Sequence, residues 1–332
     1  MNLSWQIIRF NLKETFAIAY GNYSHRDALI VTLTKNNISG YGECTAIDYY
    51  QIDLLDYTQK LKEIKTFVEN QIIVYPTDFY IFLLSLDLPS FLRSALDCAY
   101  WDLYGKLENK SFLELNKISF NKVPESSITI SVAAIDKQID KIEKSKWTKF
   151  KVKCSHFDEN QIDCLLNMNR EIGLDANGSF TVSQCQWLEN CEKAKQFTYI
   201  EQPMQIGEEY YSHLKTSAFP NWMADEDCQG ISNLKNLKPH YRTINIKLVK
   251  CGGLTPALQL IAEAKKMDFK IMIGCMTEST IGISAGAVLA PLVDYADLDG
   301  ANLIANDIAN GSFVLNGKIN LSDQAGLGIK LM

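Results

Sequence analysis

The feature that most limits the fold is an alternation of short apolar segments with helical ones from about residue 126 onward. The apolar segments cover residues 127–133, 149–153, 173–177, 199–203, 222–226, 244–250, 269–275 and 295–300. Strands that alternate with helices, such as 183–197 and 255–267, predict a parallel α/β sheet. Eight strands also suffice to close such a sheet into a barrel. We predict a barrel over residues 126–309, with an open doubly wound sheet as the alternative. The nucleotide-binding form of that sheet lacks its Gly-x-Gly-x-x-Gly fingerprint here.

The first part of the chain has a different pattern. Residues 5–16 and 27–36 alternate β-branched or aromatic residues with polar ones, which indicates strands, and 40–46 reads as a turn with a short strand. Residues 54–68 and 90–107 have helical periodicity. We therefore predict a separate α+β domain over residues 1–125.

Composition excludes several classes of protein. Of the 332 residues 47% are hydrophobic, enough for a large core and more than one domain. A net charge of −6 without a dense Lys/Arg stripe argues against a nucleic-acid partner. The sequence has no signal-like N-terminus and no apolar run of membrane-spanning length, and its nine cysteines form no Cys-x-x-Cys pair. We expect a cytoplasmic protein with reduced thiols, no membrane association and no zinc site.

Carboxylates follow three consecutive predicted strands. Asp175, Glu201 and Asp225 stand at the ends of the third, fourth and fifth strands, and the carboxyl ends of barrel strands meet at one mouth. Three anions at one mouth repel each other unless a cation lies among them. Oxygen ligands without Cys or His favour Mg²⁺, Mn²⁺ or Ca²⁺. We predict these residues as metal ligands, with Asn177 and Glu226 orienting them or accepting hydrogen bonds.

Lysines flank the predicted metal site. Lys151 and Lys153 lie on one face of the second strand, and Lys247 follows the sixth strand on the other side of the carboxylates. We expect neighbouring ammonium groups and a divalent cation to lower the lysine pKa values, as a general base near neutral pH requires. With a base on each side of a metal-bound carboxylate, a proton can be removed from one face of the substrate and returned to the other face.

The runs KVK, DAN, IEQP, ADE, IKLVKCGG and GCMTEST, in this order, resemble the enolase superfamily in its muconate-cycloisomerase-like branch. The resemblance covers nearly the whole chain. It implies a (β/α)₇β barrel of the TIM type, with an N-terminal α+β capping domain to which residues 310–332 return. It also implies one Mg²⁺ per subunit, with Mn²⁺ as a substitute, and an enediolate intermediate.

The resemblance also implies roles for individual residues. Lys153 is the expected base on one face of the α-carbon, and Lys247 serves the opposite face. Lys151 is expected to tune Lys153 and to contact the substrate carboxylate, which the Mg²⁺ would bind. Dipeptide epimerases, N-acylamino-acid racemases, o-succinylbenzoate synthases and muconate cycloisomerases share this apparatus.

The Asp297-Leu298-Asp299 run at the eighth strand resembles the dipeptide epimerases, in which it binds the ammonium of the N-terminal residue. We therefore predict a Mg²⁺-dependent dipeptide epimerase that moves a proton at the α-carbon of the C-terminal residue. Met276, within GCMTEST, is a further candidate for substrate binding. The alternatives are an o-succinylbenzoate synthase or N-acylamino-acid racemase of the same branch, a barrel that only binds ligands, and a metal-free Schiff-base aldolase using Lys247. A homo-oligomer is expected by analogy alone.

The loop after the first strand departs from the pattern. In L-Ala-D/L-Glu epimerases it resembles a segment whose arginine pairs with the glutamate side chain. Here Tyr20, Gly21 and Asn22 stand at about that place. The nearest arginine is Arg26, which we take as a candidate for contacting the substrate side chain. The preferred dipeptide side chains therefore stay open.

Overall fold

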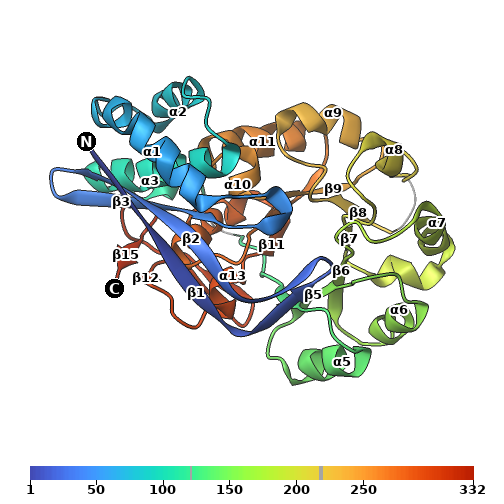
Figure 1. The fold of residues 1–332 in the computed structure, drawn as a ribbon. Coiled ribbons are helices and arrows are strands. Elements are labelled where there is room, and N and C mark those ends of the chain that lie inside the picture. Colours follow the sequence, from blue (N-terminus) through green and yellow to red (C-terminus); the bar gives the residue numbers. More distant parts are fainter. Residues whose placement is uncertain (120–121, 217–219) are drawn as a thin grey trace.

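Residues 1–119, 122–216 and 220–332 are described by a computed structural model, which contains two main sheets (Figure 1). One is an eight-stranded parallel sheet in the order β11-β10-β9-β8-β7-β6-β5-β4. The other is a three-stranded antiparallel sheet in the order β1-β2-β3. No helix of the described ranges is long and apolar enough to cross a membrane.

The eight parallel strands form the predicted barrel. They are β4 (Ile128–Ile130), β5 (Lys149–Lys153), β6 (Glu171–Asp175), β7 (Ile200–Glu201), β8 (Trp222–Ala224), β9 (Thr243–Ile246), β10 (Lys270–Gly274) and β11 (Tyr295–Asp297). The first and last strands meet through a parallel bridge between Ser126 and Ala296. This arrangement confirms the predicted (β/α)₇β barrel and rejects the open sheet.

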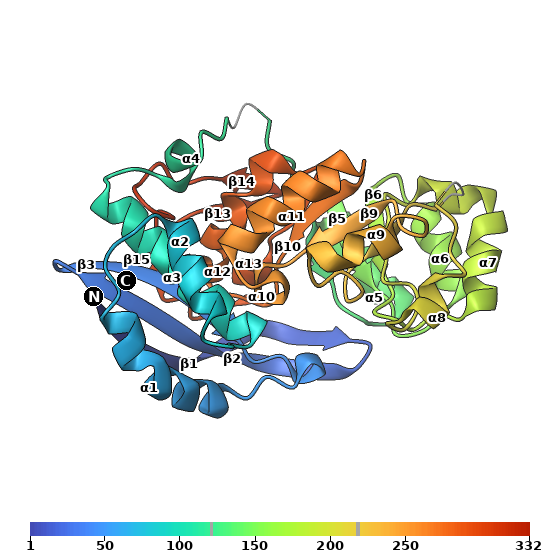
Figure 2. The same cartoon turned by 90° about the horizontal axis from the view of Figure 1, so that it is seen from above.

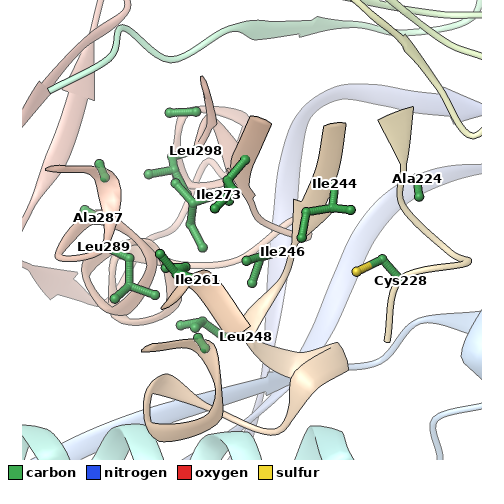
Figure 3. Packing of buried hydrophobic residues seen from close by; sticks show 14 of the residues in the cluster. Ala224, Cys228, Ile244, Ile246, Leu248, Ile261, Ile273, Ala287, Leu289 and Leu298 are labelled. Carbon is green, nitrogen blue, oxygen red and sulfur yellow. The ribbon is translucent and has the colours of Figure 1, made fainter. Parts of the chain in front are cut away.

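Helices surround the barrel and bury the outer faces of its strands. They are α5 (Ile135–Lys144), α6 (Glu159–Leu166), α7 (Val182–Asn190), α8 (Glu208–Tyr211), α9 (Leu234–Leu237), α10 (Leu248–Cys251), α11 (Leu254–Lys266), α12 (Thr280–Ala287) and α13 (Gly300–Leu303). Figure 3 shows side chains from neighbouring elements, including Ile246, Ile261 and Ile273, packing together in this layer. The apolar side chains of the strands that face the helices, such as Phe150, Val152 and Leu174, are buried in this layer.

The capping sheet consists of β1 (Asn2–Ile18), β2 (Gly21–Lys35) and β3 (Ile38–Thr45). The helices beside it are α1 (Leu54–Glu69), α2 (Pro76–Leu84), α3 (Ser90–Leu107) and α4 (Phe112–Leu115). The predicted loop after the first strand is instead the end of a long hairpin, because β1 and β2 stay paired up to Ile18 and Gly21. Both views show this hairpin extending from the capping helices toward the barrel (Figure 1, Figure 2).

The C-terminal segment contacts both parts of the molecule. It contains β12 (Ala309–Asn310), β13 (Phe313–Leu315), β14 (Lys318–Asn320) and β15 (Lys330–Leu331). Gly317 accepts a hydrogen bond from Ser126 at the start of the barrel, whereas the Leu327 amide donates to Asp102 of α3. Lys106 of α3 donates to the Ile329 carbonyl at 2.8 Å. We propose from these contacts that the last residues belong with the capping domain, and that residues 313–320 pack on the barrel.

Candidate active site

A cavity lies at the carboxyl ends of the barrel strands, beneath the hairpin of the capping domain. It is lined by Lys151, Lys153, Asn177, Glu226, Lys247, Met276, Asp297 and Asp299 from the barrel, and by Phe16, Ile18, Tyr20, Arg26, Ile47 and Tyr50 from the cap. The space open to the centres of water-sized molecules is about 80 Å³. The cavity therefore brings together the predicted lysines, both aspartates of the Asp-x-Asp run, and the two further candidates for substrate binding, Arg26 and Met276.

The three predicted metal ligands lie side by side on neighbouring strands. Asp175 ends β6 and is in register with Glu201 of β7, and Asp225 directly follows β8. Asp175 and Glu201 are fully buried and Asp225 is 1% exposed. Parallel pairing thus gathers three carboxylates in the interior of the mouth, where an isolated charge is costly.

Ammonium groups neutralise these carboxylates in the structure. Lys151 Nζ lies 2.8 Å from Glu201 and 3.3 Å from Asp175. Lys153 Nζ lies 2.5 Å from Asp175 Oδ2, and Lys247 Nζ lies 2.7 Å from Asp225 Oδ2. The two predicted bases therefore stand on β5 and after β9, on either side of the carboxylate-bearing strands.

The lowering of the lysine pKa values expected beside a bound divalent cation stays a prediction, and the carboxylate contacts in the structure act in the opposite direction on Lys151 and Lys247. Burial alone lowers the pKa of Lys151, but the carboxylates of Asp297, Glu201 and Asp175 raise it well above its ordinary value. Burial likewise opposes the charge on Lys247, and Asp225 nevertheless raises its pKa. The prediction counted the neighbouring ammonium groups and a divalent cation, and it did not include the direct carboxylate contacts of Lys151 and Lys247.

Sequence analysis missed Lys250 as part of this site. Its side chain is 1% exposed, and its Nζ lies 2.5 Å from Asp225 Oδ1 and donates to the Asn245 carbonyl at 3.1 Å. Burial raises the pKa of Asp225, but Lys247 and Lys250 together hold it well below its usual range. The sequence did contain a signal for Lys250, which lies three residues after Lys247. One helical turn brings a residue at this spacing back to the same side as Lys247.

The Asp-x-Asp run closes the seam between the last and first strands. Asp297 accepts hydrogen bonds from Ser127 Oγ and Lys151 Nζ, both at 2.9 Å. Asp299 accepts from the Thr129 amide at 2.7 Å, and within the described ranges it forms no ion pair with a lysine or arginine. Burial raises the pKa of Asp299 to about 7, and the neighbouring Asp297 adds to this rise. Asp299 is therefore a buried carboxyl that a cation entering the cavity would stabilise.

The cap contributes a tyrosine at the tip of its hairpin. Tyr20 donates a hydrogen bond to Glu226 Oε1 at 3.3 Å, and its ring stacks on Tyr49 with centroids 4.9 Å apart. Asn177 Nδ2 lies 3.4 Å from the same oxygen, and Lys153 donates to Asn177 Oδ1 at 3.2 Å. A chain of polar contacts thus connects the hairpin tip to a predicted base.

Arg26 is a buried cation on the wall of the cavity. It is 6% exposed, it donates to the Ala46 carbonyl at 2.9 Å, and its guanidinium lies 4.4 Å from the centre of the Tyr23 ring. Its Nε has no hydrogen-bond partner, and burial lowers its pKa. Arg26 therefore retains an unused donor beside the cavity.

Comparison with known proteins decides the family. The family described as "Enolase C-terminal domain-like" matches residues 134–332. The chain belongs to this family. It is 36% identical to the L-Ala-D/L-amino acid epimerase of Maribacter sp., over 100% of this chain and 99% of that protein. These matches confirm the prediction of an isomerase of the epimerase and racemase class.

Solved structures of the family have the same fold. A dipeptide epimerase from Enterococcus faecalis, complexed with Mg and L-Leu-L-Tyr, is 26% identical with a TM-score of 0.86, covering 99% of this chain and 98% of that one. An enolase family member from Agrobacterium tumefaciens, with bound sodium and L-Ala-L-Glu, is 25% identical with a TM-score of 0.84. It covers 96% of this chain and 97% of its own. The likeness therefore extends over the cap and the barrel together.

The carboxylate cluster of this enolase-family chain suits a hard divalent cation in its chemistry. Its donors are all oxygens, and they are buried. As placed here, no three Asp, Glu, His or Cys side chains in the described part of the chain are grouped to hold a metal ion. The ammonium groups of Lys151 and Lys153 contact the same carboxylates, so a cation would enter by displacing those contacts.

Proposed function

We propose that this protein is a Mg²⁺-dependent dipeptide epimerase, acting at the α-carbon of the C-terminal residue. The observation that carries the proposal is a buried carboxylate cluster flanked by Lys153 and Lys247, with the unpaired Asp299 at the same mouth. The names of the relatives, which are epimerases of L-Ala-containing and of hydrophobic dipeptides, support the same activity. No described feature favours the synthase or N-acyl racemase alternatives over it.

The proposed residue roles follow from position. Lys153 removes the α-proton from one stereoisomer, and Lys247 delivers a proton to the opposite face. Lys151, which already contacts two of the carboxylates, holds the substrate carboxylate beside them. Asn177 and Glu226 keep Lys153 and the hairpin in place. The lysine that accepts the proton must be uncharged at that moment and so has to give up its ion pair, whereas the lysine that delivers a proton must be charged.

Asp175, Glu201 and Asp225 would hold one Mg²⁺ per subunit, with Mn²⁺ as a substitute. A bound divalent cation supplies Lewis-acid stabilisation of the negative charge that develops on the substrate carboxylate. The Mg in the Enterococcus faecalis structure supports this choice of ion. Cation binding would also draw Asp175 away from Lys153, which would remove the ion pair between these two side chains.

Substrate recognition is divided between the two ends of the cavity. Asp299, with Asp297 behind it, pairs with the ammonium of the N-terminal residue. Met276 and the cap residues Ile18 and Ile47 contact the side chain of the C-terminal residue. The free Nε of Arg26 is available to an acceptor on that side chain.

The test is deuterium incorporation from D₂O into pooled L,L-dipeptides, measured by mass spectrometry with Mg²⁺ and with EDTA. We expect uptake of one deuterium that requires Mg²⁺. Lys153→Ala and Lys247→Ala should each lower epimerisation by about 100-fold or more. One of these variants should still exchange the α-proton of a single stereoisomer. Uptake that persists in EDTA, or full activity of both variants, would reject the mechanism.

N-acyl amino acids serve as the control substrates. If they react with Mg²⁺ while free-amine dipeptides do not, the racemase alternative replaces this proposal. Asp299→Asn should lower kcat/KM for dipeptides more than for N-acyl substrates. Homo-oligomerisation stays a prediction, which light scattering of the purified protein tests.

A further inference from the structure

Gln202 directly follows the proposed metal ligand Glu201 and has an uncommon backbone conformation. Its φ of 34° is positive, which is rare for residues other than glycine and asparagine. The residue is also buried, with 1% of its surface exposed. Residues in such strained conformations gather at functional sites, where the surrounding contacts hold them in place. The contacts of Gln202 therefore indicate what its conformation is for.

The side-chain amide of Gln202 uses all four of its hydrogen-bonding positions. Its oxygen accepts from the Asp225 amide at 3.1 Å and from the Asp227 amide at 3.2 Å. Its nitrogen donates to the Met204 carbonyl at 2.9 Å and to Asp227 Oδ2 at 2.8 Å. These partners fix the orientation of the amide, because backbone N–H groups only donate and carbonyl oxygens only accept. The side chain therefore bridges the ends of β7 and β8.

The backbone of Gln202 extends this connection to the end of β6. The Gly178 amide, three residues after Asp175, donates to the Gln202 carbonyl at 2.7 Å. Gly178 has a φ of 77°, so the chain after β6 also turns through the left-handed region at this contact. One residue thus joins the three segments that carry Asp175, Glu201 and Asp225.

These bonds use none of the carboxylate oxygens of the proposed ligands. Gln202 contacts the backbone of Asp225, whereas the two carboxylate oxygens of Asp225 contact Lys247 and Lys250. The lysine contacts have to change when a cation enters, but no hydrogen bond of Gln202 does. The amide is also uncharged, so it does not compete with a cation for the carboxylates. Its hydrogen bonds are therefore compatible with either partner of the carboxylates, the lysines or a cation.

We propose that Gln202 is a positioning residue for the metal site, which fixes the relative placement of the strand ends that carry Asp175, Glu201 and Asp225. This inference rests on the proposed function, and specifically on a divalent cation held by these three carboxylates. Carboxylates whose placement is set before binding need less rearrangement when the cation arrives. Since Gln202 supplies no ligand oxygen, its loss should weaken cation binding without abolishing it.

The first test measures the Kd for Mn²⁺ alone, without substrate, by electron paramagnetic resonance of the unbound ion. Gln202→Met keeps a similar side-chain length but removes the four side-chain hydrogen bonds, and should raise the Kd by about 10-fold or more. The matched control is Gln205→Met in the same loop, because Gln205 is exposed, and its Kd should stay near the wild-type value. Circular dichroism establishes that each variant is folded during the measurement. An unchanged Kd in folded Gln202→Met protein would overturn the proposal.

A second variant separates the amide from the backbone conformation. Gln202→Asn tolerates a positive φ better than glutamine, but its amide is one methylene shorter and does not span the two strand ends. We expect weaker Mn²⁺ binding in this variant as well. Wild-type affinity in Gln202→Asn would show that the bridge is dispensable and would reject the positioning role. If Gln202→Met does not fold, this variant decides the question.

Glu201→Gln distinguishes a failure of this inference from a failure of the proposed function. If the wild type binds Mn²⁺ and Glu201→Gln weakens that binding strongly, the proposed metal site stands and the Gln202 variants alone decide the positioning role. If the wild type binds no Mn²⁺, or Glu201→Gln binds it equally well, the proposed metal site is wrong and the positioning role is rejected with it.

Discussion

At the residue scale, the hairpin tip and a predicted base are connected through side chains alone. The path runs from Tyr20 to Glu226, from Glu226 to Asn177 and from Asn177 to Lys153, with steps of 3.3, 3.4 and 3.2 Å. Each step is a weak hydrogen bond by its length. Together they connect the position of Lys153 to that of Tyr20 at the hairpin tip.

Removing the Tyr20 hydroxyl tests this dependence. Tyr20→Phe keeps the ring stacked on Tyr49 but loses the bond to Glu226, so kcat should fall by about 3- to 10-fold. The fall should be larger for the stereoisomer deprotonated by Lys153, as seen in α-proton exchange of the separate L,L and L,D substrates. Tyr49→Phe retains the stacking and the Tyr20 hydroxyl, and should leave kcat near its original value. Equal effects of the two variants on kcat would contradict the connection between Tyr20 and Lys153.

Asp97 predicts a pH dependence of stability. It is fully buried in α3, where it accepts hydrogen bonds from the Thr255 amide and hydroxyl of α11, both at 2.8 Å. Burial raises its pKa from 3.8 to about 7. The folded protein therefore holds this proton more tightly than the unfolded chain. The resulting stabilisation is complete below about pH 4 and is lost as the pH rises through about 7.

Urea unfolding between pH 5 and pH 8 measures this effect. The free energy of unfolding of the wild type should fall over this range by about 1–3 kcal/mol more than that of Asp97→Asn, which cannot ionise. Parallel curves for the two proteins would show that Asp97 is ionised across the whole range. Differences at one pH alone carry no information here, because asparagine also changes the hydrogen bonds to Thr255.

The residue types of the candidate site were predictable, but their present contacts were not. Asp175, Glu201 and Asp225 follow strands, and strand ends can be read from a change of apolar to polar residues. Lys250 was missed because a lone lysine after an apolar run reads as a surface residue. Asp297 was expected to face a substrate ammonium, yet it contacts Lys151, since pairing across the barrel depends on which strands become neighbours.

At the element scale, α3 approaches the capping sheet through glycine. A Cβ on Gly42 of β3 would lie 1.9 Å from the Ala95 carbonyl oxygen, and one on Gly40 would lie 2.2 Å from the Ala99 oxygen. Backbone atoms of a helix cannot move aside as a side-chain end can. The close packing of β3 on α3 therefore requires glycine at both positions.

Gly42→Ala should lower the free energy of unfolding by about 2–3 kcal/mol, because the helix has to move away from the sheet. Gly230→Ala is the matched control, since a Cβ there meets nothing within 4 Å and its φ of 176° is ordinary extended backbone. Its effect should stay within about 0.5 kcal/mol. Thermal unfolding of both variants measures the difference, and a stable Gly42→Ala protein would show that the interface can open without loss.

The bounds of two elements were predicted correctly from their apolar periodicity. The helix expected over 90–107 is α3 with the same bounds, and the strand expected over 149–153 is β5. The prediction of a single strand over the apolar run 244–250 was wrong, because β9 ends at Ile246 and α10 begins at Leu248. Short apolar runs suit a buried strand and a buried helical turn equally, so periodicity cannot separate the two.

At the scale of the whole molecule, the end of the chain joins its two parts. Leu327 is 1% exposed, and its amide donates to Asp102, which also accepts from the Tyr41 amide and pairs with Lys106. One buried carboxylate thus ties α3, the capping sheet and the C-terminal residues together. The C-terminal residues around Leu327 are therefore expected to contribute to the free energy of unfolding, although they do not line the active-site cavity.

Leu327→Ala should cost about 2–4 kcal/mol, because it leaves a hole at this junction. Leu315→Ala, at a side chain that is 60% exposed, should change the free energy of unfolding by less than about 0.5 kcal/mol. Chemical denaturation followed by tryptophan fluorescence measures both. A small effect of Leu327→Ala would mean that the packing of the last residues against α3 and the capping sheet contributes little to stability.

The seam of the barrel has a consequence for how such an enzyme can diverge. The first and last strands meet at the Ser126–Ala296 bridge, and beyond it Asp297 and Asp299 take hydrogen bonds from Ser127 and Thr129. The two carboxylates proposed to recognise the substrate therefore also hold the first and last strands of the barrel together. A lineage that abandons free-amine substrates cannot simply lose these aspartates. Each replacement has to keep an oxygen that accepts from the Ser127 hydroxyl or the Thr129 amide, so drift in specificity here should pass through asparagine rather than through apolar residues.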